Sequence, residues 1–311
     1  MLPIKIDLPE GFLEEEVRCG YTVSAEMKKL WAVELDLLAE FDRVCRKNNL
    51  TYYAFGGTLL GAVRHRGFIP WDDDIDVVMF REDFEKLCEI ADKEFQRPYF
   101  FQTPFSDPGL VMGGCRLRNS DTTVSNDVEF KRPYKNKGIF IDLFVIDGIP
   151  DKESRLRKLK SRLKLYWRLL RYAAYYDCYF EKGKKYPVKR LLAGKLSLGL
   201  KYIFGIERLS RGYGRLCSKY SGRNTKQIAP LEFSRGKDIY QREWYGGTVY
   251  VPFEHMRVPV PEGFDQLLSA TYGDYMVMKR VPPVHRPFTF DTEIPFSVYY
   301  AKRPEFEEKS L

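Results

Sequence analysis

Four aspartates within five positions constrain this chain more than any other sequence feature. They follow an apolar stretch with paired glycines in TYYAFGGTLLGAVRHRGFIPWDDDIDVVMF, residues 51–80. Two unit charges about 4 Å apart repel by roughly 4 kcal/mol at an effective dielectric constant near 20. Asp72, Asp73, Asp74 and Asp76 therefore need a cationic partner if they lie close together in the folded chain.

The residues around the last of these aspartates predict a buried strand. Residues 74–80 read DIDVVMF, and the two-residue period of a strand would send Asp74 and Asp76 to one face. Two carboxylates on one face present oxygens to a common point, as a hard ion such as Mg2+ requires. The alternative is a solvated acidic turn, the usual meaning of a run such as residues 72–74. Asp76 favours the metal site, because a charge within a buried strand is seldom unpaired.

The composition is that of a folded globular protein with a large core. The 311 residues are 44% hydrophobic and 15% aromatic, which argues against disorder. Six scattered cysteines with no CxxC pair argue against a zinc ribbon or a disulfide scaffold and favour reduced thiols. Residues 1–16 lack a signal-like apolar run, and no apolar segment approaches the ~18 residues that span a bilayer. We therefore expect a cytoplasmic location.

Apolar periodicity predicts an α+β fold with a mixed sheet core flanked by helices. Ser24 is a suitable cap for a first helix that extends to about residue 47. Two further helices are expected over residues 58–64, opened by the glycine pair, and 81–95. Strands are expected over residues 50–55, 74–80, 99–103, 114–118 and 138–146.

The last of these strands carries a second isolated carboxylate. In GIFIDLFVID, Asp142 interrupts an apolar run and needs a partner. We interpret it as a third member of the metal site; the alternative is an aspartate satisfied by a nearby arginine or backbone amide. Asp147 precedes Gly148 and Pro150, and is interpreted as a turn residue that ends the strand.

One segment carries all of the excess positive charge. Residues 151–220 contain 20 Lys and Arg against 5 Asp and Glu, whereas the rest of the chain has 31 against 38. The segment has helical spacing and favours contact with anionic lipid headgroups or a phosphate-bearing acceptor. The alternative is a plain helical subdomain with a solvated basic face. Nucleic acid is disfavoured as a partner, because no glycine, zinc or heptad signature of a nucleic-acid module accompanies the charge.

The order of these features resembles the nucleotidyltransferase fold of the polymerase-beta group. Within that fold, the strings GGTLLGAVRHRGFIPWDDDID, FIDLFVIDGIP and the late YGDYM are similar to the LicD family, which is linked to phosphorylcholine transfer. The expected parts are a catalytic core with an N-terminal helix over residues 1–150, a basic helical insert over 151–222, and a segment over 223–311 that completes the core and active site.

The resemblance implies transfer of a phospho-alcohol, phosphocholine first among them, from a CDP-alcohol donor to a hydroxyl group, with CMP leaving. The implied acceptor is a cell-surface glycan or lipid-linked glycan, such as a lipopolysaccharide or teichoic-acid precursor. Mg2+, or Mn2+ in its place, would be held by Asp74, Asp76 and Asp142, with Asp142 also accepting the proton of the attacking hydroxyl. Such an enzyme is expected in the cytoplasm, with peripheral contact at the inner face of an anionic membrane.

The glycine pair and the residues after it are the expected phosphate contacts. Gly56 and Gly57 let backbone amides and a helix N-terminus face a phosphate, and Thr58 adds a hydroxyl donor. Arg64 offers a fork of donors that suits a phosphate, and His65 is a candidate for phosphate binding or acid catalysis. The alternative for His65 is an ordinary surface or core side chain.

Trp71 is the aromatic residue beside the acidic run, and a quaternary ammonium is favoured over aromatic faces by roughly 0.5 to 2 kcal/mol per contact. The alternative is that it fills the core. Two other functions fit the same residues. One is a nucleotidyltransferase that moves a nucleotide and releases pyrophosphate; the other is a non-catalytic nucleotide-binding or membrane-docking module.

Overall fold

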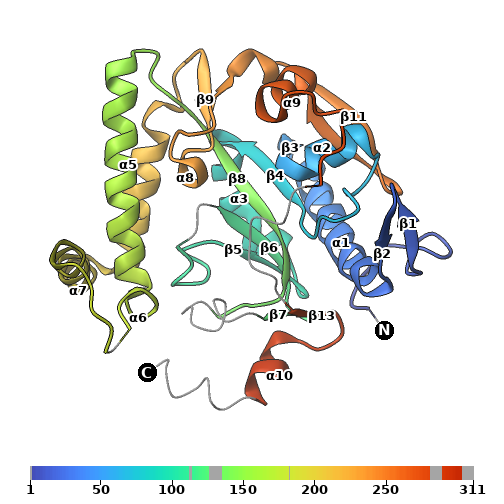
Figure 1. The fold of residues 1–311 in the computed structure, drawn as a ribbon, viewed down its shortest axis with the longest axis horizontal. Coiled ribbons are helices and arrows are strands. Elements are labelled where there is room, and N and C mark those ends of the chain that lie inside the picture. The colour runs from blue at the N-terminus through green and yellow to red at the C-terminus, as the bar shows by residue number, and fades with distance from the viewer. Residues whose placement is uncertain (1, 112–113, 126–134, 182, 281–288, 303–311) are drawn as a thin grey trace.

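The computed structural model describes residues 2–111, 114–125, 135–181, 183–280 and 289–302. A central mixed sheet is flanked by helices on a chain of mixed α/β architecture (Figure 1). The predicted mixed sheet with flanking helices is therefore confirmed, while the name of the fold stays a prediction.

The strand β8 (Ile139–Gly148) organises the central sheet. β4 (Asp76–Phe80) pairs with β8 in parallel, and β6 (Cys115–Asn119) pairs with it antiparallel along the opposite edge. Four shorter strands extend the sheet: β3 (Tyr52–Ala54) beside β4, β5 (Tyr99–Gln102) beside β6, β9 (Gln227–Ala229) beside the end of β8, and β10 (Tyr240–Gln241) beside β9.

Three two-stranded sheets lie outside the central one. They are β1 (Glu16–Arg18) with β2 (Tyr21–Val23), β11 (Thr248–Phe253) with β12 (Met256–Pro261), and β7 (Thr123–Ser125) with β13 (Thr289–Asp291).

The helix α1 (Ala25–Lys47) begins and ends where its sequence predicts. The Oγ atom of Ser24 accepts a hydrogen bond from the backbone N–H of Met27 at 3.2 Å, which caps the first turn. The helix packs against β6 and β8. Its buried stripe recurs at helical spacing and includes Leu30, Trp31, Leu35, Leu38 and Phe41.

Two further helices connect strands of the sheet. α2 (Gly56–Arg64) follows β3, and α3 (Arg81–Glu94) follows β4 directly and packs against β4 and β8. The remaining short helices are α8 (Leu231–Ser234), α9 (Phe264–Tyr272), α10 (Phe296–Ala301) and the 3-10 turns η1 (Ser218–Tyr220) and η2 (Arg242–Tyr245).

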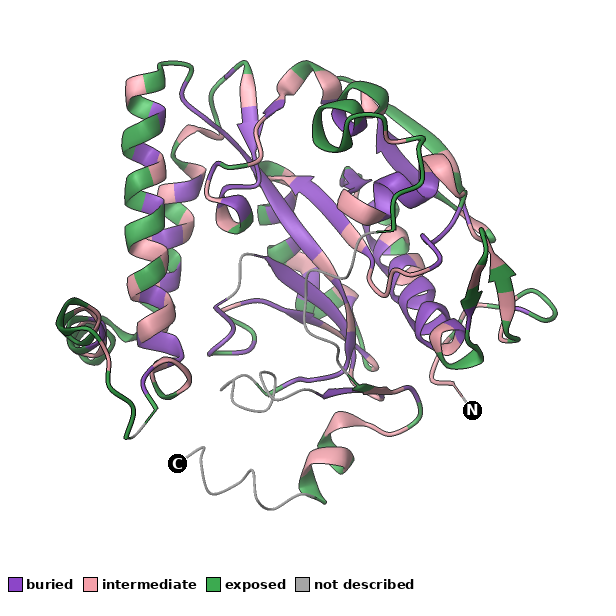
Figure 2. Ribbon diagram, viewed as in Figure 1, coloured by how far each residue is buried: buried purple, intermediate pink, exposed green. Residues whose placement is uncertain are grey.

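The basic segment is helical, as predicted. α5 (Glu153–Ala174), α6 (Tyr176–Tyr179) and α7 (Val188–Cys217) lie at one side of the sheet, at the left of Figure 1. They share a cluster of buried apolar residues separate from the main core, with α5 buried on one face and exposed on the other (Figure 2). The expected boundaries at residues 150 and 222 stay predictions. Among the described helices, none is long and apolar enough to cross a membrane.

Candidate functional site

The glycine pair packs directly against two carboxylates of the acidic run. A side-chain carbon added at Gly57 would lie 2.5 Å from Oδ2 of Asp72, and one added at Gly56 would lie 3.1 Å from Oδ2 of Asp76. Gly56 also has a φ of +54°, which favours glycine. The two glycines are therefore needed both for the turn into α2 and for the close approach of the carboxylates.

The hydroxyl of Thr58 joins α2 to the acidic strand. Its Oγ1 atom accepts a hydrogen bond from the backbone N–H of Asp76 at 2.8 Å, and the residue is buried. The backbone N–H of Phe55 donates to the carbonyl oxygen of Asp76 at 3.0 Å. Thr58 thus anchors Asp76, and its predicted contact with a phosphate stays a prediction.

The acidic run is a loop that ends in a strand. We expected a strand from residue 74, but β4 begins at Asp76, so the strand periodicity that would place Asp74 and Asp76 on one face does not apply. The loop itself brings carboxylates together: one oxygen each from Asp72, Asp73 and Asp74 lie within 4.8 Å of one another. Asp72 and Asp73, which were not among the predicted metal ligands, are thereby candidate ligands as well.

A row of charged residues crosses three neighbouring strands. Asp76 on β4 stands opposite Asp142 on β8, and Asp142 stands opposite Arg116 on β6. Directly opposed residues of neighbouring strands project on the same face of a sheet. The parallel pairing of β4 and β8 therefore places Asp142 beside the acidic loop.

Asp142 has the arginine partner that was the alternative to a metal role. The Nε atom of Arg116 donates to Oδ1 of Asp142 at 2.9 Å, and the guanidinium lies 3.8 Å from the centre of the Phe140 ring. The Arg116 side chain is buried, while that of Asp142 is about one quarter exposed. Arg116 occupies one lone pair of Oδ1, which makes Oδ2 the more accessible oxygen of Asp142 for a metal or a proton.

Asp76 lies half-buried among other negative side chains. Burial raises the pKa of Asp76 well above its usual range, and the charges of Asp74, Asp142 and Asp72 raise it further. Arg116 opposes this shift. The guanidinium of Arg116 therefore faces several negative groups.

A sixth carboxylate, on α1, lies near the loop. Glu34 is 2% exposed, and its Oε2 atom has no hydrogen-bond partner among the described residues. Burial raises the pKa of Glu34, and the charges of Asp74 and Asp73 are the next largest causes. Glu34 was not predicted from the sequence, because a single glutamate in an amphipathic helix has the pattern of a solvated position. Its only signal was its place between apolar residues in the stripe of α1.

Arg64 and His65 contact each other and the C-terminal part of the chain. The Nε atom of Arg64 donates to Nε2 of His65 at 3.0 Å, and Nη1 donates to the carbonyl oxygen of Tyr275 at 2.7 Å. Burial and then the charges of Arg64 and Arg18 lower the pKa of His65. In this arrangement His65 is neutral and Nε2 accepts. The contact ties the late YGDYM motif to α2; direct phosphate binding by either residue stays a prediction.

Two aromatic residues stand near the acidic loop. Trp71 is half-buried, with its ring 6.0 Å from that of Tyr21 and 6.4 Å from that of His65, both edge to face. Tyr272, at the end of α9, is 40% exposed. Burial and the charges of Asp76 and other loop aspartates raise the pKa of Tyr272 to about 12. The C-terminal segment thus brings an aromatic ring to the carboxylates.

Asp147 is a buried structural residue, so its interpretation as a turn residue was wrong. It lies within β8, is fully buried, and accepts from Nε and Nη2 of Arg81 at 2.8 and 2.7 Å. Ser221 donates to the same carboxylate at 2.6 Å, and Glu232 takes a further bond from Arg81. The sequence hid this network because its members lie far apart in the chain.

The acidic loop fits a hard divalent cation. Carboxylate oxygens are the donors that Mg2+ prefers. Here three such oxygens are within 4.8 Å of one another, and glycine replaces any side chain that would push Asp72 away. Glu34, whose Oε2 has no hydrogen-bond partner among the described residues, places a further carboxyl group near the same aspartates.

Residues 49–158 match the family model described as "LicD/FKTN/FKRP, nucleotidyltransferase domain". The chain carries a LicD-family domain. This confirms the resemblance drawn from the glycine pair and the acidic run. The matched residues contain all of the predicted site residues, from Gly56 to Asp142, whereas Glu34 and Tyr272 lie outside them.

The similarity to LicD extends beyond the matched domain. The chain is 28% identical over 269 residues to "Lipopolysaccharide cholinephosphotransferase LicD" of Haemophilus influenzae, covering 83% of this chain and 94% of that relative. An uncharacterized protein of Rickettsia prowazekii is 33% identical over 115 residues, 37% of this chain and 39% of that protein. An uncharacterized protein of Caenorhabditis elegans is 53% identical over 47 residues, 15% of this chain and 12% of that protein.

Proposed function

We propose that this chain is a metal-dependent phosphotransferase that moves a phospho-alcohol, phosphocholine in the first instance, from a CDP-alcohol to a hydroxyl of a cell-surface glycan. The acceptor would be a lipopolysaccharide or teichoic-acid precursor, reached from the cytoplasmic side of the membrane. The similarity to LicD of Haemophilus influenzae, which spans 94% of that relative, supports the activity. The nucleotidyltransferase fold is part of the same proposal.

The observation that carries the proposal is the contact between the glycine pair and the carboxylates. Gly57 lies against Asp72 and Gly56 against Asp76, at the N-terminus of α2. A helix N-terminus favours negative charge, whereas the carboxylates repel it. A diphosphate can satisfy both only together with a cation, so this pairing favours a metal-bound diphosphate over a lone anion.

The reaction proceeds by displacement at the phosphorus atom that bears the alcohol. The acceptor hydroxyl oxygen forms a new bond to this phosphorus, and the bond to the bridging oxygen breaks, so that CMP leaves with the electron pair. The hydroxyl proton passes to a carboxylate, for which we assign Oδ2 of Asp142, because Arg116 holds Oδ1. When bound to Asp74, Asp76 and Asp142, with Asp72 as a further ligand, Mg2+ or Mn2+ would neutralise the charge that gathers on the leaving CMP.

The protein groups around the cluster position the donor. The backbone N–H groups at the start of α2 face the phosphates, and Thr58 keeps Asp76 in register with them. Arg64 holds the C-terminal segment in place through the carbonyl of Tyr275. Trp71 and Tyr272 offer aromatic faces to the alcohol, and a quaternary ammonium such as choline gains roughly 0.5 to 2 kcal/mol from each such contact.

Asp76→Asn tests the proposal, because it removes a charge with little change in volume. With CDP-choline, a lipopolysaccharide acceptor and Mg2+, we expect release of CMP by the wild type and a loss of at least about 100-fold in the variant. Thermal unfolding without metal should show a folded variant, since the substitution relieves repulsion in the loop. Asp121→Asn, at the surface pair with Arg97, is the matched control and should keep full activity.

Two results would overturn this function. Release of pyrophosphate from CTP or ATP in place of CMP would favour a nucleotidyltransferase. Undiminished turnover by Asp76→Asn would remove the metal assignment. A thermal-shift comparison of CDP-choline, CDP-ribitol, CDP-glycerol, CTP and ATP, with and without Mg2+, identifies the donor independently of the acceptor. A ligand at about 100 times its dissociation constant stabilises the native state by roughly 2.7 kcal/mol.

A further inference from the structure

The first half of α7 exposes its apolar side chains. Val188, Leu192, Leu196 and Ile203 follow one another at steps of four, four and seven residues, which places them on one side of the helix. Their exposed fractions are 71%, 62%, 55% and 71%. Together with the neighbouring exposed residues Leu191 and Tyr202, they form what we call the apolar face of α7.

The opposite side of the helix is fixed to the protein by small residues. Gly194 and Ser197 are buried, and a side chain at Gly194 would meet the ring of Phe180 at 2.6 Å. Arg190 donates through Nη2 to the carbonyl oxygen of Tyr179 at 2.8 Å. A helix of a globular protein normally buries its apolar stripe and exposes its polar side. In this half of α7 the apolar side is exposed and the side with small residues is packed against the protein. The apolar face is therefore exposed because of the way in which the helix packs.

The charge of this region has one sign. Residues 183–206 contain six Lys and Arg and no Asp or Glu. Lys189 and Lys195 are exposed along the same helix, Lys189 at the edge of the apolar face and Lys195 within it, while the exposed Lys201 lies on the opposite side near the kink. A helix with exposed leucine and isoleucine on one side and lysine beside them is the type that lies in a membrane interface and prefers anionic lipids.

A kink directs this half of α7 away from the body of the protein. Gly205 has φ 72° and ψ 158°, and the chain resumes its helix afterwards. In Figure 1 the first half is seen nearly end-on at the lower left, while the second half lies behind α5, and Figure 2 shows the first half as largely exposed. The kink separates a half that packs on α5 from a half that faces outward.

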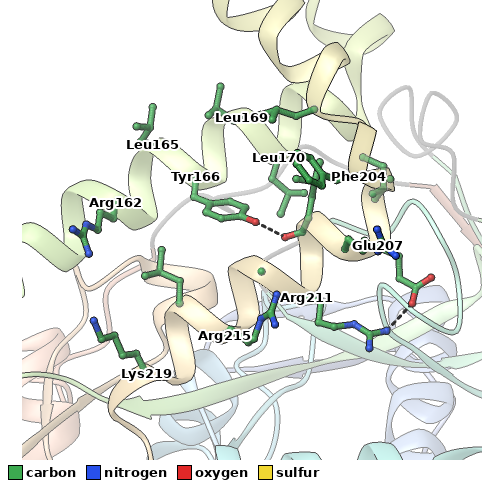
Figure 3. A pocket seen from close by; sticks show the side chains of 17 residues that line it. Arg162, Leu165, Tyr166, Leu169, Leu170, Phe204, Glu207, Arg211, Arg215 and Lys219 are labelled. Carbon is green, nitrogen blue, oxygen red and sulfur yellow. Dashed lines mark hydrogen bonds and ion pairs between the residues drawn. The ribbon is translucent and has the colours of Figure 1, made fainter. Parts of the chain in front are cut away.

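Beyond the kink, a groove continues the apolar surface. It has a volume of about 1260 Å³ and is lined mainly by α5 and α7 (Figure 3). Leu165 and Phe204, 57% and 48% exposed, lie in its lining, with Arg162, Arg211 and Arg215 beside them. The groove thus combines apolar side chains with neighbouring basic ones, as the apolar face of α7 does.

We propose that the apolar face of α7 docks in the plane of a membrane that contains anionic phospholipid. Val188, Leu192, Leu196 and Ile203 would enter the boundary between headgroups and acyl chains, and the lysines on this side of the helix would contact lipid phosphates. The membrane contact expected for the whole basic segment is thereby assigned to the first half of α7. It does not depend on the proposed chemistry at the acidic loop, which lies on different elements.

Vesicle co-sedimentation of the full chain tests this docking. Phosphatidylcholine vesicles with 30 mol% phosphatidylglycerol should bind the wild type at least about tenfold more strongly than vesicles of phosphatidylcholine alone, and 0.5 M salt should weaken the binding. The double variant Leu192→Ser, Ile203→Ser removes apolar surface without a change in charge. We expect it to lose at least about tenfold in binding to the anionic vesicles.

Val17→Ser is the matched control, since Val17 on β1 is 71% exposed, as Ile203 is. It should bind vesicles as the wild type does, and thermal unfolding should show that both variants are folded, because the substituted residues are exposed. Equal binding by wild type and double variant would overturn the proposal, as would absence of binding by the wild type or equal binding to both vesicle types. A wild-type dimer that the double variant converts to a monomer, without vesicle binding, would show that a second copy covers this face.

Discussion

We predict that Gly57→Ala weakens metal binding and activity without lowering the stability of the fold. The added methyl group would lie 2.5 Å from Oδ2 of Asp72, whereas ordinary contacts of this kind begin at 3.4 Å. The carboxylate must therefore move by about 1 Å. The backbone of Asp72 is held, because its carbonyl accepts from Nε1 of Trp31 at 3.0 Å and its N–H donates to Ile69 at 2.9 Å. The side chain moves out of the cluster and the loop stays in place.

The expected size of the effect follows from this displacement. Mg2+ is bound at 2.0 to 2.1 Å with nearly ideal octahedral geometry, so a shift of about 1 Å removes a ligand. We expect Mg2+ to be bound about 10- to 100-fold more weakly and CMP release to fall by a similar factor. Gly57 lies in α2, where alanine is favoured over glycine by up to about 1 kcal/mol. The melting temperature without metal should therefore be unchanged or higher.

A Mg2+ titration of CMP release, together with thermal unfolding in EDTA, measures both effects. Gly199→Ala is the matched control, because Gly199 also lies in a helix and a side chain there would meet nothing within 4 Å. It should share the gain in stability and keep the Mg2+ dependence of the wild type. Wild-type Mg2+ dependence in Gly57→Ala would refute the reasoning, because Asp72 would then not need its present position. A lower melting temperature of Gly57→Ala would refute the claim that alanine is tolerated at this position of α2.

Two other changes separate structural carboxylates from those of the site. Asp147→Asn breaks the buried pair with Arg81 and should destabilise the protein by about 3 kcal/mol in denaturant unfolding, with no change in the Mg2+ midpoint of CMP release. Asp142→Asn should abolish transfer. The reverse pattern would contradict our assignment. Glu34→Gln should raise the melting temperature without metal, because burial and the loop aspartates raise the pKa of Glu34. In the wild type, the stability contributed by a glutamate with a raised pKa is fully present below the pKa of the unfolded chain, about 4.3, and is lost as the pH rises through the pKa of the folded protein. The difference in melting temperature between Glu34→Gln and the wild type should therefore grow from pH 5 to 8. Parallel melting curves across this range would show that Glu34 is not buried near negative charge.

Local signals in the sequence predicted the main helices and the longer strands of the central sheet. The cap at Ser24 and the apolar period after it define α1, because a helix is stabilised by neighbours three and four residues apart. The glycine pair and Asp76 lie together, since both belong to one strand–helix–strand stretch, β3, α2 and β4, whose two strands pair antiparallel. The start of β4 was misplaced by two residues, because the same alternating pattern fits a strand and the loop that leads into it.

The sequence by itself determined the main helices and the longer strands of the central sheet, and that carboxylates and glycines meet between β3 and β4. Only the tertiary structure decided which distant groups join them. Glu34 reaches the loop because α1 crosses the sheet, and Asp147 finds Arg81 across 66 positions of the chain. The same holds for α7, whose sequence shows an apolar stripe but not its direction. Periodicity describes a side chain relative to its own helix or strand, whereas its partners depend on how those elements pack in space.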